Sequence, residues 1–189
     1  LIFPRPDGSV KVLPWMFVSQ AAVDQRRGRT GASYDAFAAA GELIVTDGNS
    51  TDYDVIFTQM SKCADMFDVQ SVAFDRWNSS ALVQKLMDAG FDMDPFGQGF
   101  ASMSQPIKQM EIMIKQKKLH HGGHGMLRWM ASNIQTKTDE AMNIKFVKSK
   151  SGDKIDGMVA LAMAVGEWMT NDNDNAGGSV YETNDIRFL

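Results

Sequence analysis

Two aspartates of this chain stand where carboxylates can bind a metal ion. Asp75 ends a short apolar run, Val72 to Phe74, and Arg76 follows it. Such a run, bounded by polar residues, is typical of a buried parallel strand. In open α/β sheets, ligands bind just beyond the carboxyl ends of the strands. We therefore expect Asp75 at the edge of a sheet, where a charge needs a partner or a metal.

Asp156 is the second of these aspartates, and it lies in the first turn of a helix predicted over residues 154–170. Gly157 and Ala160 are small, so this helix can approach a sheet closely. The simpler interpretation is that Asp156 complements the helix dipole. The alternative is that Asp75 and Asp156 converge on a divalent cation, because Mg²⁺ prefers carboxylate oxygens. Two such ions about 3.5–4 Å apart stabilise both oxygens in phosphodiester cleavage.

Basic residues close to this pair are candidates for DNA contacts. A metal site that cuts DNA needs cations nearby to hold the phosphates, and a basic run precedes the last helix. It consists of Lys145, Lys148, Lys150 and Lys154. Arg76 either orients a carboxylate or meets a phosphate. The lysines at 115, 117 and 118 fit a solvated helix end as well as a DNA contact, and His120, His121 and His124 fit phosphate contact or solvent exposure better than zinc.

The elements around Asp75 predict a largely parallel sheet. A helix over 51–67 precedes the Asp75 strand, and a helix over 79–89 and a strand over 91–95 follow it. Alternation of helices and strands requires crossover connections and indicates an α/β fold. Cys63 lies on the apolar face of the first of these helices and is most simply a buried thiol.

The rest of the chain predicts shorter elements. The turn at 4–9 joins two strands, and the second strand carries Val10, Val12, Trp15 and Phe17. Residues 19–40 leave the sheet and contain one short helix. Ser104 opens a helix with Pro106 in its first turn. Residues 132–147 form a hairpin, and a polar flexible tail occupies 171–189.

Composition is that of an ordinary globular protein. The 189 residues are 44% hydrophobic and 22% charged, which suits one domain with a tail. No apolar run approaches the length of a membrane span, so no membrane association is expected. The net charge of −4 excludes binding of nucleic acid through global charge alone.

Several stretches together resemble a known family, the nuclease domain of the large terminase subunit of tailed bacteriophages. Weaker matches lie at residues 46–49 and 52–54, and the resemblance covers residues 10–166. The main matching stretches are 72–78 (Val-Ala-Phe-Asp-Arg-Trp-Asn), 96–104 (Phe-Gly-Gln-Gly-Phe-Ala-Ser-Met-Ser), 127–133 (Leu-Arg-Trp-Met-Ala-Ser-Asn) and 154–163 (Lys-Ile-Asp-Gly-Met-Val-Ala-Leu-Ala-Met).

The resemblance implies a ribonuclease H-like mixed sheet flanked by helices. It implies a metal-dependent endonuclease that cuts concatemeric double-stranded viral DNA during packaging, with two Mg²⁺ or Mn²⁺ ions and water as the nucleophile. Asp75 matches the family's strand-end aspartate, and Asp156 matches the aspartate that opens its last helix. The partners implied are DNA and, in the full-length protein, an ATPase domain, the terminase small subunit and the portal. The implied location is the cytoplasm of the bacterial host.

The sequence departs from the family at its beginning. The family's first metal-binding aspartate lies on a strand upstream of the 4–9 turn, whereas this chain begins at Leu1, within the second strand. Residues 1–170 are therefore expected to form a nuclease domain that lacks its first strand, binds metal weakly and cuts slowly or not at all. No Gly-Lys dipeptide is present, hence no P-loop. Two alternatives stay open: another ribonuclease H-like enzyme, of transposase or resolvase type, or a non-catalytic DNA-binding and docking module.

Overall fold

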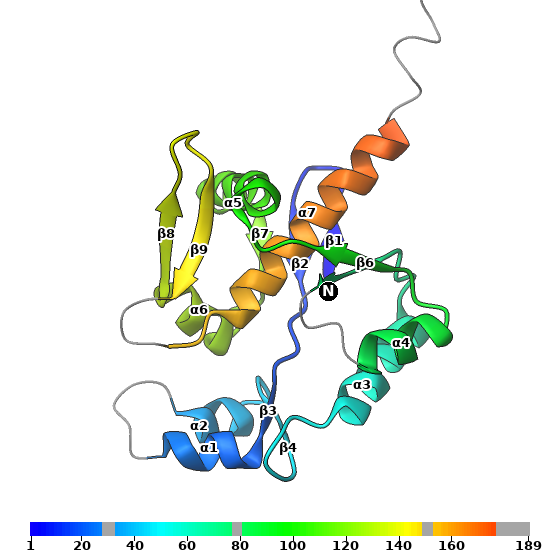
Figure 1. Cartoon of the computed structure of the whole chain (residues 1–189), viewed down its shortest axis with the longest axis vertical. Coiled ribbons are helices and arrows are strands. Elements are labelled where there is room, and N and C mark those ends of the chain that lie inside the picture. The colour runs from blue at the N-terminus through cyan, green and yellow to red at the C-terminus, as the bar shows by residue number, and fades with distance from the viewer. Residues whose placement is uncertain (28–32, 77–80, 149–152, 177–189) are drawn as a thin grey trace, which may run out of the picture.

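The structure is a computed structural model, and it describes residues 1–27, 33–76, 81–148 and 153–176. Helices and short strands are mixed along the described chain, as predicted, and the longest helix lies near the carboxyl end (Figure 1). In chain order the elements are β1 (Ile2–Pro4), β2 (Val10–Val12), β3 (Phe17–Ser19), α1 (Gln20–Arg26), α2 (Tyr34–Ala39), β4 (Ile44–Thr46), α3 (Tyr53–Met66), β5 (Val72–Asp75), α4 (Ala81–Asp88), β6 (Met93–Phe96), α5 (Phe100–Lys115), β7 (Leu119–His120), α6 (Gly125–Ser132), β8 (Ile134–Thr138), β9 (Ile144–Lys148) and α7 (Asp156–Ala176).

The first two strands form the predicted hairpin. β1 pairs antiparallel with β2, and β7 joins the other edge of β2 in parallel. Gly8 takes a left-handed φ of 74° in the turn, a conformation that suits glycine. The prediction of one long return strand was wrong. The strand ends at Val12, because Pro14 has no N–H for a ladder, and Phe17 begins β3, which pairs in parallel with β4.

β5 and β6 form a parallel pair, as the predicted position of Asp75 at the end of a parallel strand requires. Val72 pairs with Met93, and Asp75, the last residue of β5, pairs with Phe96. The strand and its end are therefore confirmed. Its predicted full burial was wrong, since all four residues of β5 are half-buried.

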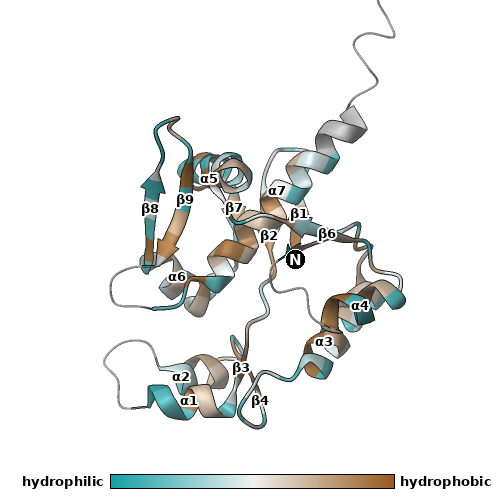
Figure 2. Cartoon of the chain, in the orientation of Figure 1, coloured by the Kyte–Doolittle hydropathy of each residue, from teal (hydrophilic) through white to brown (hydrophobic). Residues whose placement is uncertain are grey.

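α7 passes through the middle of the molecule and carries much of its core. Its amino-terminal half is hydrophobic and packs against α5 and α6, whereas its carboxyl-terminal half is more polar (Figure 2). Methionines fill much of this interface, as their flexible thioethers allow. The buried residues here are Met158, Leu161, Ala162, Met163 and Val165 of α7 with Met103, Ile107, Met110 and Met113 of α5.

Three helix boundaries differ from prediction. α7 begins at Asp156 rather than 154 and continues to Ala176, so the predicted tail over 171–189 is helical at its start. The remaining residues, 177–189, lie outside the described chain. α5 begins at Phe100, not Ser104, because the Ser104 hydroxyl is buried and accepts a hydrogen bond from the Ile144 amide of β9 (3.2 Å) instead of capping.

The excursion over 19–40 holds two helices rather than one. The hydroxyl of Ser19 caps α1 by accepting a bond from Ala22 N (3.4 Å). The hydroxyl of Ser33 caps α2 in the same way, from Ala36 N (3.3 Å). Each serine starts a separate helix, which is why a single one does not form. No helix of the described residues is long and apolar enough to cross a bilayer.

Candidate functional site

The carboxyl end of β5 and the amino end of α7 point in the same direction. Asn171, near the end of the described part of α7, donates to the hydroxyl of Ser71 just before β5 (3.0 Å). At the other end of β5, Asp75 pairs with Phe96, whose ring lies against Gly166. Following β5 toward Asp75 therefore leads along α7 toward its amino end, where Asp156 lies.

The two predicted metal ligands differ in exposure. Asp75 is half-buried, and Asp156, the first residue of α7, is exposed to solvent. Their carboxylates suit a hard divalent cation in kind. Two carboxylates are too few for a complete metal site, and no cluster of three His, Cys, Asp or Glu side chains able to hold a metal ion occurs among the described residues.

The segment that leads into α7 is held by side chains from distant elements. Arg26 of α1 forms an ion pair with Asp153 at 2.5 Å. The amide of Asn133, at the end of α6, donates to the carbonyl oxygen of Lys154 (3.0 Å). The sequence analysis assigned neither residue this role, although Asn133 ends the matching stretch 127–133, because the paired residues are 127 and 21 positions apart.

Three of the predicted DNA-contact lysines lie within the described chain. Lys145 of β9 is half-buried, with its Nζ 4.8 Å from the centre of the Phe100 ring. Lys154 is exposed and directly precedes the Ile155–Asp156 dipeptide, while Lys148 ends β9. Lys150 lies outside the described residues. Arg76 is exposed next to Asp75.

One further lysine belongs with these basic residues. Lys137 of β8 is the direct cross-strand partner of Lys145. Like charges directly opposite each other repel, so the pair destabilises the hairpin unless an anion binds between or above them. The sequence contained a usable signal: once the turn of the hairpin is placed at residues 139–143, counting outward pairs Lys137 with Lys145.

One of the three histidines, His124, has a structural role at the start of α6. His124 is its N-cap, and its Nδ1 accepts a hydrogen bond from Leu127 N (3.2 Å). Glu42 accepts bonds from the first two amides of the helix, Gly125 N (2.6 Å) and Met126 N (2.9 Å). Burial lowers the pKa of His124, and the nearby Glu42 carboxylate opposes that shift. His124 is therefore neutral at pH 7, which lets its nitrogen accept this bond.

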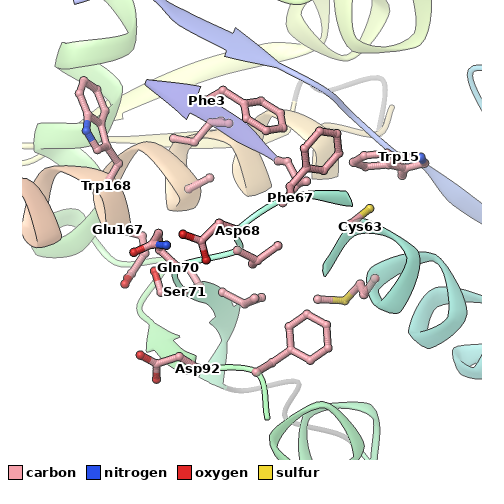
Figure 3. A pocket seen from close by; sticks show the side chains of 18 of the residues that line it. Phe3, Trp15, Cys63, Phe67, Asp68, Gln70, Ser71, Asp92, Glu167 and Trp168 are labelled. Atoms are coloured by element: carbon pink, nitrogen blue, oxygen red, sulfur yellow. The ribbon is translucent and has the colours of Figure 1, made fainter. Parts of the chain in front are cut away.

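A groove of about 820 Å³ separates the β1–β2 hairpin from the β5–β6 pair. Figure 3 shows it bounded by Phe3, Phe67 and Trp15 on one side and by Ser71, Glu167 and Trp168 on the other. Two unbroken runs line it, residues 1–4 and 67–73. Successive side chains of a strand alternate between faces, so an unbroken run shows that the strand edge itself borders the groove.

Backbone groups on both edges point into the space between them. Leu1 and Leu13 exchange two hydrogen bonds of 2.9 Å, so the neighbouring Ile2 turns its N–H and C=O away from β2. Val72 N donates to Asp92 O of the β6 side (2.8 Å), so Ala73 turns its groups away from β6. In the described chain β1 pairs with β2 alone, and β5 with β6 alone.

Comparison with protein families and curated proteins gives matches over most of the chain. The model of the family described as "Terminase large subunit, endonuclease domain" matches residues 1–172. The large terminase subunit of Enterobacteria phage HK97 is 33% identical over 162 residues, which cover 85% of this chain and 32% of that protein. Protein YmfN of Escherichia coli K12 is 30% identical, over 85% of this chain and 36% of that protein. The chain thus spans about a third of the length of these relatives.

Two solved structures are also similar. The HK97 bacteriophage large terminase superposes with a TM-score of 0.80 at 32% identity, over 88% of this chain and 35% of that one. The large terminase nuclease of thermophilic phage G20c has a TM-score of 0.50 at 14% identity, over 62% and 63% of the two chains. The second likeness shows a shared fold alone, of the ribonuclease H-like type, and confirms the predicted fold class.

Proposed function

Because the chain belongs to the family of terminase large subunit endonuclease domains, we propose that it takes part in metal-dependent cleavage of double-stranded DNA. The substrate is the concatemeric viral genome, which is cut during packaging. The observation that carries this proposal is that β5 and α7 run in opposite directions, so that the end of β5 with Asp75 points the same way as the amino end of α7, where Asp156 lies. Other ribonuclease H-like enzymes are less well supported, because the family match covers residues 1–172.

Asp75 and Asp156 are the proposed ligands of Mg²⁺ or Mn²⁺. When bound there, such ions would supply Lewis-acid chemistry, which can activate water and stabilise charge on a phosphate. The chain's own side chains hold the DNA: Lys137 and Lys145 on the β8–β9 hairpin, with Lys148, Lys150 and Lys154 from the stretch that precedes α7 in the sequence, contact backbone phosphates. Arg76 is a weaker candidate for the same role. The packaging partners of the family, an ATPase domain, the small subunit and the portal, and the bacterial cytoplasm as the location, belong to the same proposal.

A complete site needs at least one more carboxylate than these two. We propose that a further strand, which carries this carboxylate, lies in the groove between β1 and β5. Support comes from the two strand edges that border the groove and from the backbone groups of Ile2 and Ala73 that face it. Calorimetric titration of the chain with Mn²⁺ tests this point: weak binding is expected, and tight binding at two sites would contradict it.

A plasmid-nicking assay with Mn²⁺ tests the function itself. Slow cleavage by the parent chain, abolished in Asp75→Ala and in Asp156→Ala, is expected. Asp54→Ala is the matched control, because Asp54 also lies in the first turn of a helix but pairs with Lys85 on the outer surface of α3 and α4. Binding of DNA without any cleavage by the parent would instead favour the non-catalytic docking module.

A further inference from the structure

Asp156 lies in a segment that is fixed on both sides of it. Before it, Asp153 is paired with Arg26, and the carbonyl of Lys154 accepts from Asn133. After it, the backbone N–H of Gly157 points at the Met130 sulfur, 3.2 Å away. The start of α7 is thereby tied to α1 and α6.

Close packing around Gly157 keeps this turn in place. The carbon of any larger side chain there would collide with the terminal methyl of Met16 and lie 2.9 Å from Met130 Sδ. The first turn of α7 is therefore pressed against the segment before β3 and against α6. A small shift of this turn would move the Asp156 carboxylate with it.

Two aromatic rings also contact the Arg26 side chain that pairs with Asp153. Its guanidinium carbon lies 4.9 Å from the centre of the Tyr34 ring and 5.1 Å from that of Trp129, and the two rings meet edge to face. Its side chain is only 17% exposed. Burial lowers the pKa of Arg26, but the hydrogen bond to Asp153 and the interactions with Tyr34 and the Asp153 charge together outweigh burial, and the net shift is upward. The side chain is thus a permanently charged partner of Asp153, and its contacts with the two rings orient it.

We propose that Arg26 is the positioning residue for Asp156. Clamped between Tyr34 and Trp129, it anchors Asp153 and so sets where α7 begins and where the Asp156 carboxylate stands. This inference rests on the proposed function, in which Asp156 is a metal ligand. In this proposal the role of α1 and α2 is to supply Arg26 and Tyr34, respectively.

The neighbouring arginine supplies a matched control. Arg27 forms ion pairs with Asp24 (2.8 Å) and Asp35 (2.9 Å), both within α1 and α2, and its side chain is 58% exposed. Loss of Arg27 therefore removes an arginine and its ion pairs from the same excursion without touching the start of α7. Any effect that follows from weakening α1 and α2 in general appears in both arginine variants.

The test compares Arg26→Gln, Arg26→Lys, Asp153→Asn and Arg27→Gln with the parent chain. Two quantities are measured at a temperature where every variant is folded: the Mn²⁺ dissociation constant, and amide hydrogen exchange along the chain.

Arg26→Gln and Asp153→Asn are expected to weaken Mn²⁺ binding roughly tenfold or more, as loss of an outer partner of a metal ligand does. They are also expected to speed exchange in the first turn of α7 but not in α3. Arg27→Gln changes neither, and Arg26→Lys lies between, since lysine keeps the charge but lacks the planar stacking group.

The outcomes that would overturn each idea are distinguishable. If Asp156→Ala leaves Mn²⁺ affinity unchanged, the proposed function is wrong. If Asp156→Ala removes binding while Arg26→Gln alters neither affinity nor exchange at the start of α7, the positioning role is wrong. If the parent chain binds Mn²⁺ too weakly to measure, exchange alone decides: faster exchange confined to the start of α7 supports the role, and unchanged or uniformly faster exchange overturns it.

Discussion

Gly166 of α7 lies directly against the ring of Phe96. A side-chain carbon added to Gly166 would come within 2.6 Å of Phe96 Cζ and 2.8 Å of Pro106 Cγ. The absence of a side chain at this position lets α7 approach both β6 and α5. Because Phe96 pairs with Asp75, the same contact sets how α7 passes the end of β5.

Replacement of Gly166 by alanine is expected to destabilise the fold. In an exposed helix, Gly→Ala gains about 1 kcal/mol, but here the added methyl group forces two rings to move, which typically costs about 1–3 kcal/mol. Urea unfolding of Gly166→Ala measures the net change. The control is Ala160→Gly, at an exposed position of the same helix, which should lose about 1 kcal/mol through helix propensity alone. A Gly166→Ala variant more stable than the parent would contradict the close contact.

Glu167 gives stability a dependence on pH. Burial raises its pKa, and a hydrogen bond with Asp94 raises it further, while bonds to Ser71 and Asn171 oppose the shift. The folded state thus holds this proton more tightly than the unfolded state does. Stability from Glu167 is therefore full at pH values below the ordinary glutamate pKa and falls as pH rises through the raised folded value. Glu167→Gln should flatten this decline in urea titrations between pH 4 and 8.

Glu111 is the control for that experiment, because its pKa is shifted in the opposite direction to that of Glu167. Its bond to Lys115 lowers its pKa, so its contribution is present above the unfolded pKa and is lost as pH falls. Glu111→Gln should therefore leave the decline toward high pH unchanged. A Glu167→Gln variant whose stability falls with pH as steeply as the parent's would show that Glu167 is not responsible.

The paired lysines of the β8–β9 hairpin are expected to bind DNA. Replacing both Lys137 and Lys145 by alanine removes two proposed phosphate contacts, so the variant should bind DNA more weakly. Loss of the repulsion between the lysines favours its stability, and loss of the contact between Lys145 and the Phe100 ring opposes this. The plot of log affinity against log salt should become shallower by roughly 0.9 for each phosphate that the variant no longer neutralises. Fluorescence anisotropy at several salt concentrations measures this.

Lys115→Ala is the control for the salt dependence. Lys115 is already paired with Glu111 at 2.6 Å and is 71% exposed at the end of α5. Its removal should change the slope little. Equal slopes for the parent and the Lys137/Lys145 double variant would exclude these lysines from the DNA-binding surface.

Glu42 stabilises the start of α6 from outside that helix. Its carboxylate accepts hydrogen bonds from the backbone N–H groups of Gly125 and Met126, which have no acceptor within the helix. Burial raises the pKa of Glu42, but these two bonds and His124 outweigh it, and the net pKa is lowered. Glu42→Gln should therefore cost about 1–2 kcal/mol at pH 7 and progressively less as pH falls through the lowered folded pKa. Thermal unfolding at pH 7 and pH 3 measures both, with the exposed Glu140→Gln as a neutral control.

Several local features could be predicted because short-range patterns specify them. The apolar run ending in Asp75, the hairpin turn around Gly8 and the amphipathic helix that buries Cys63 each depend on neighbours within a few residues. Errors arose where a distant partner decided the outcome. The sequence pattern predicts Ser104 as a helix cap. Its hydroxyl instead accepts a hydrogen bond from the Ile144 amide of β9, 40 residues away, and α5 starts earlier.

The candidate site divides in the same way. Asp75 and Asp156 could be proposed as site residues from sequence because each follows a local rule, a strand end or a helix start. The opposite directions of β5 and α7, the Lys137–Lys145 pairing and the groove between two strand edges follow from how β5, α7 and the hairpins are packed.

The sequence by itself determined the types of element, the residue at the end of β5 and the family to which the chain belongs, because periodicity and short motifs are local properties of the chain. Only the tertiary structure decided which side chains hold Asp156 in place. Arg26 and Asp153 are separated by 127 residues, and their meeting depends on Tyr34, Trp129 and the packing of α7. No local pattern encodes such a contact, since its free energy arises only when distant elements are brought together.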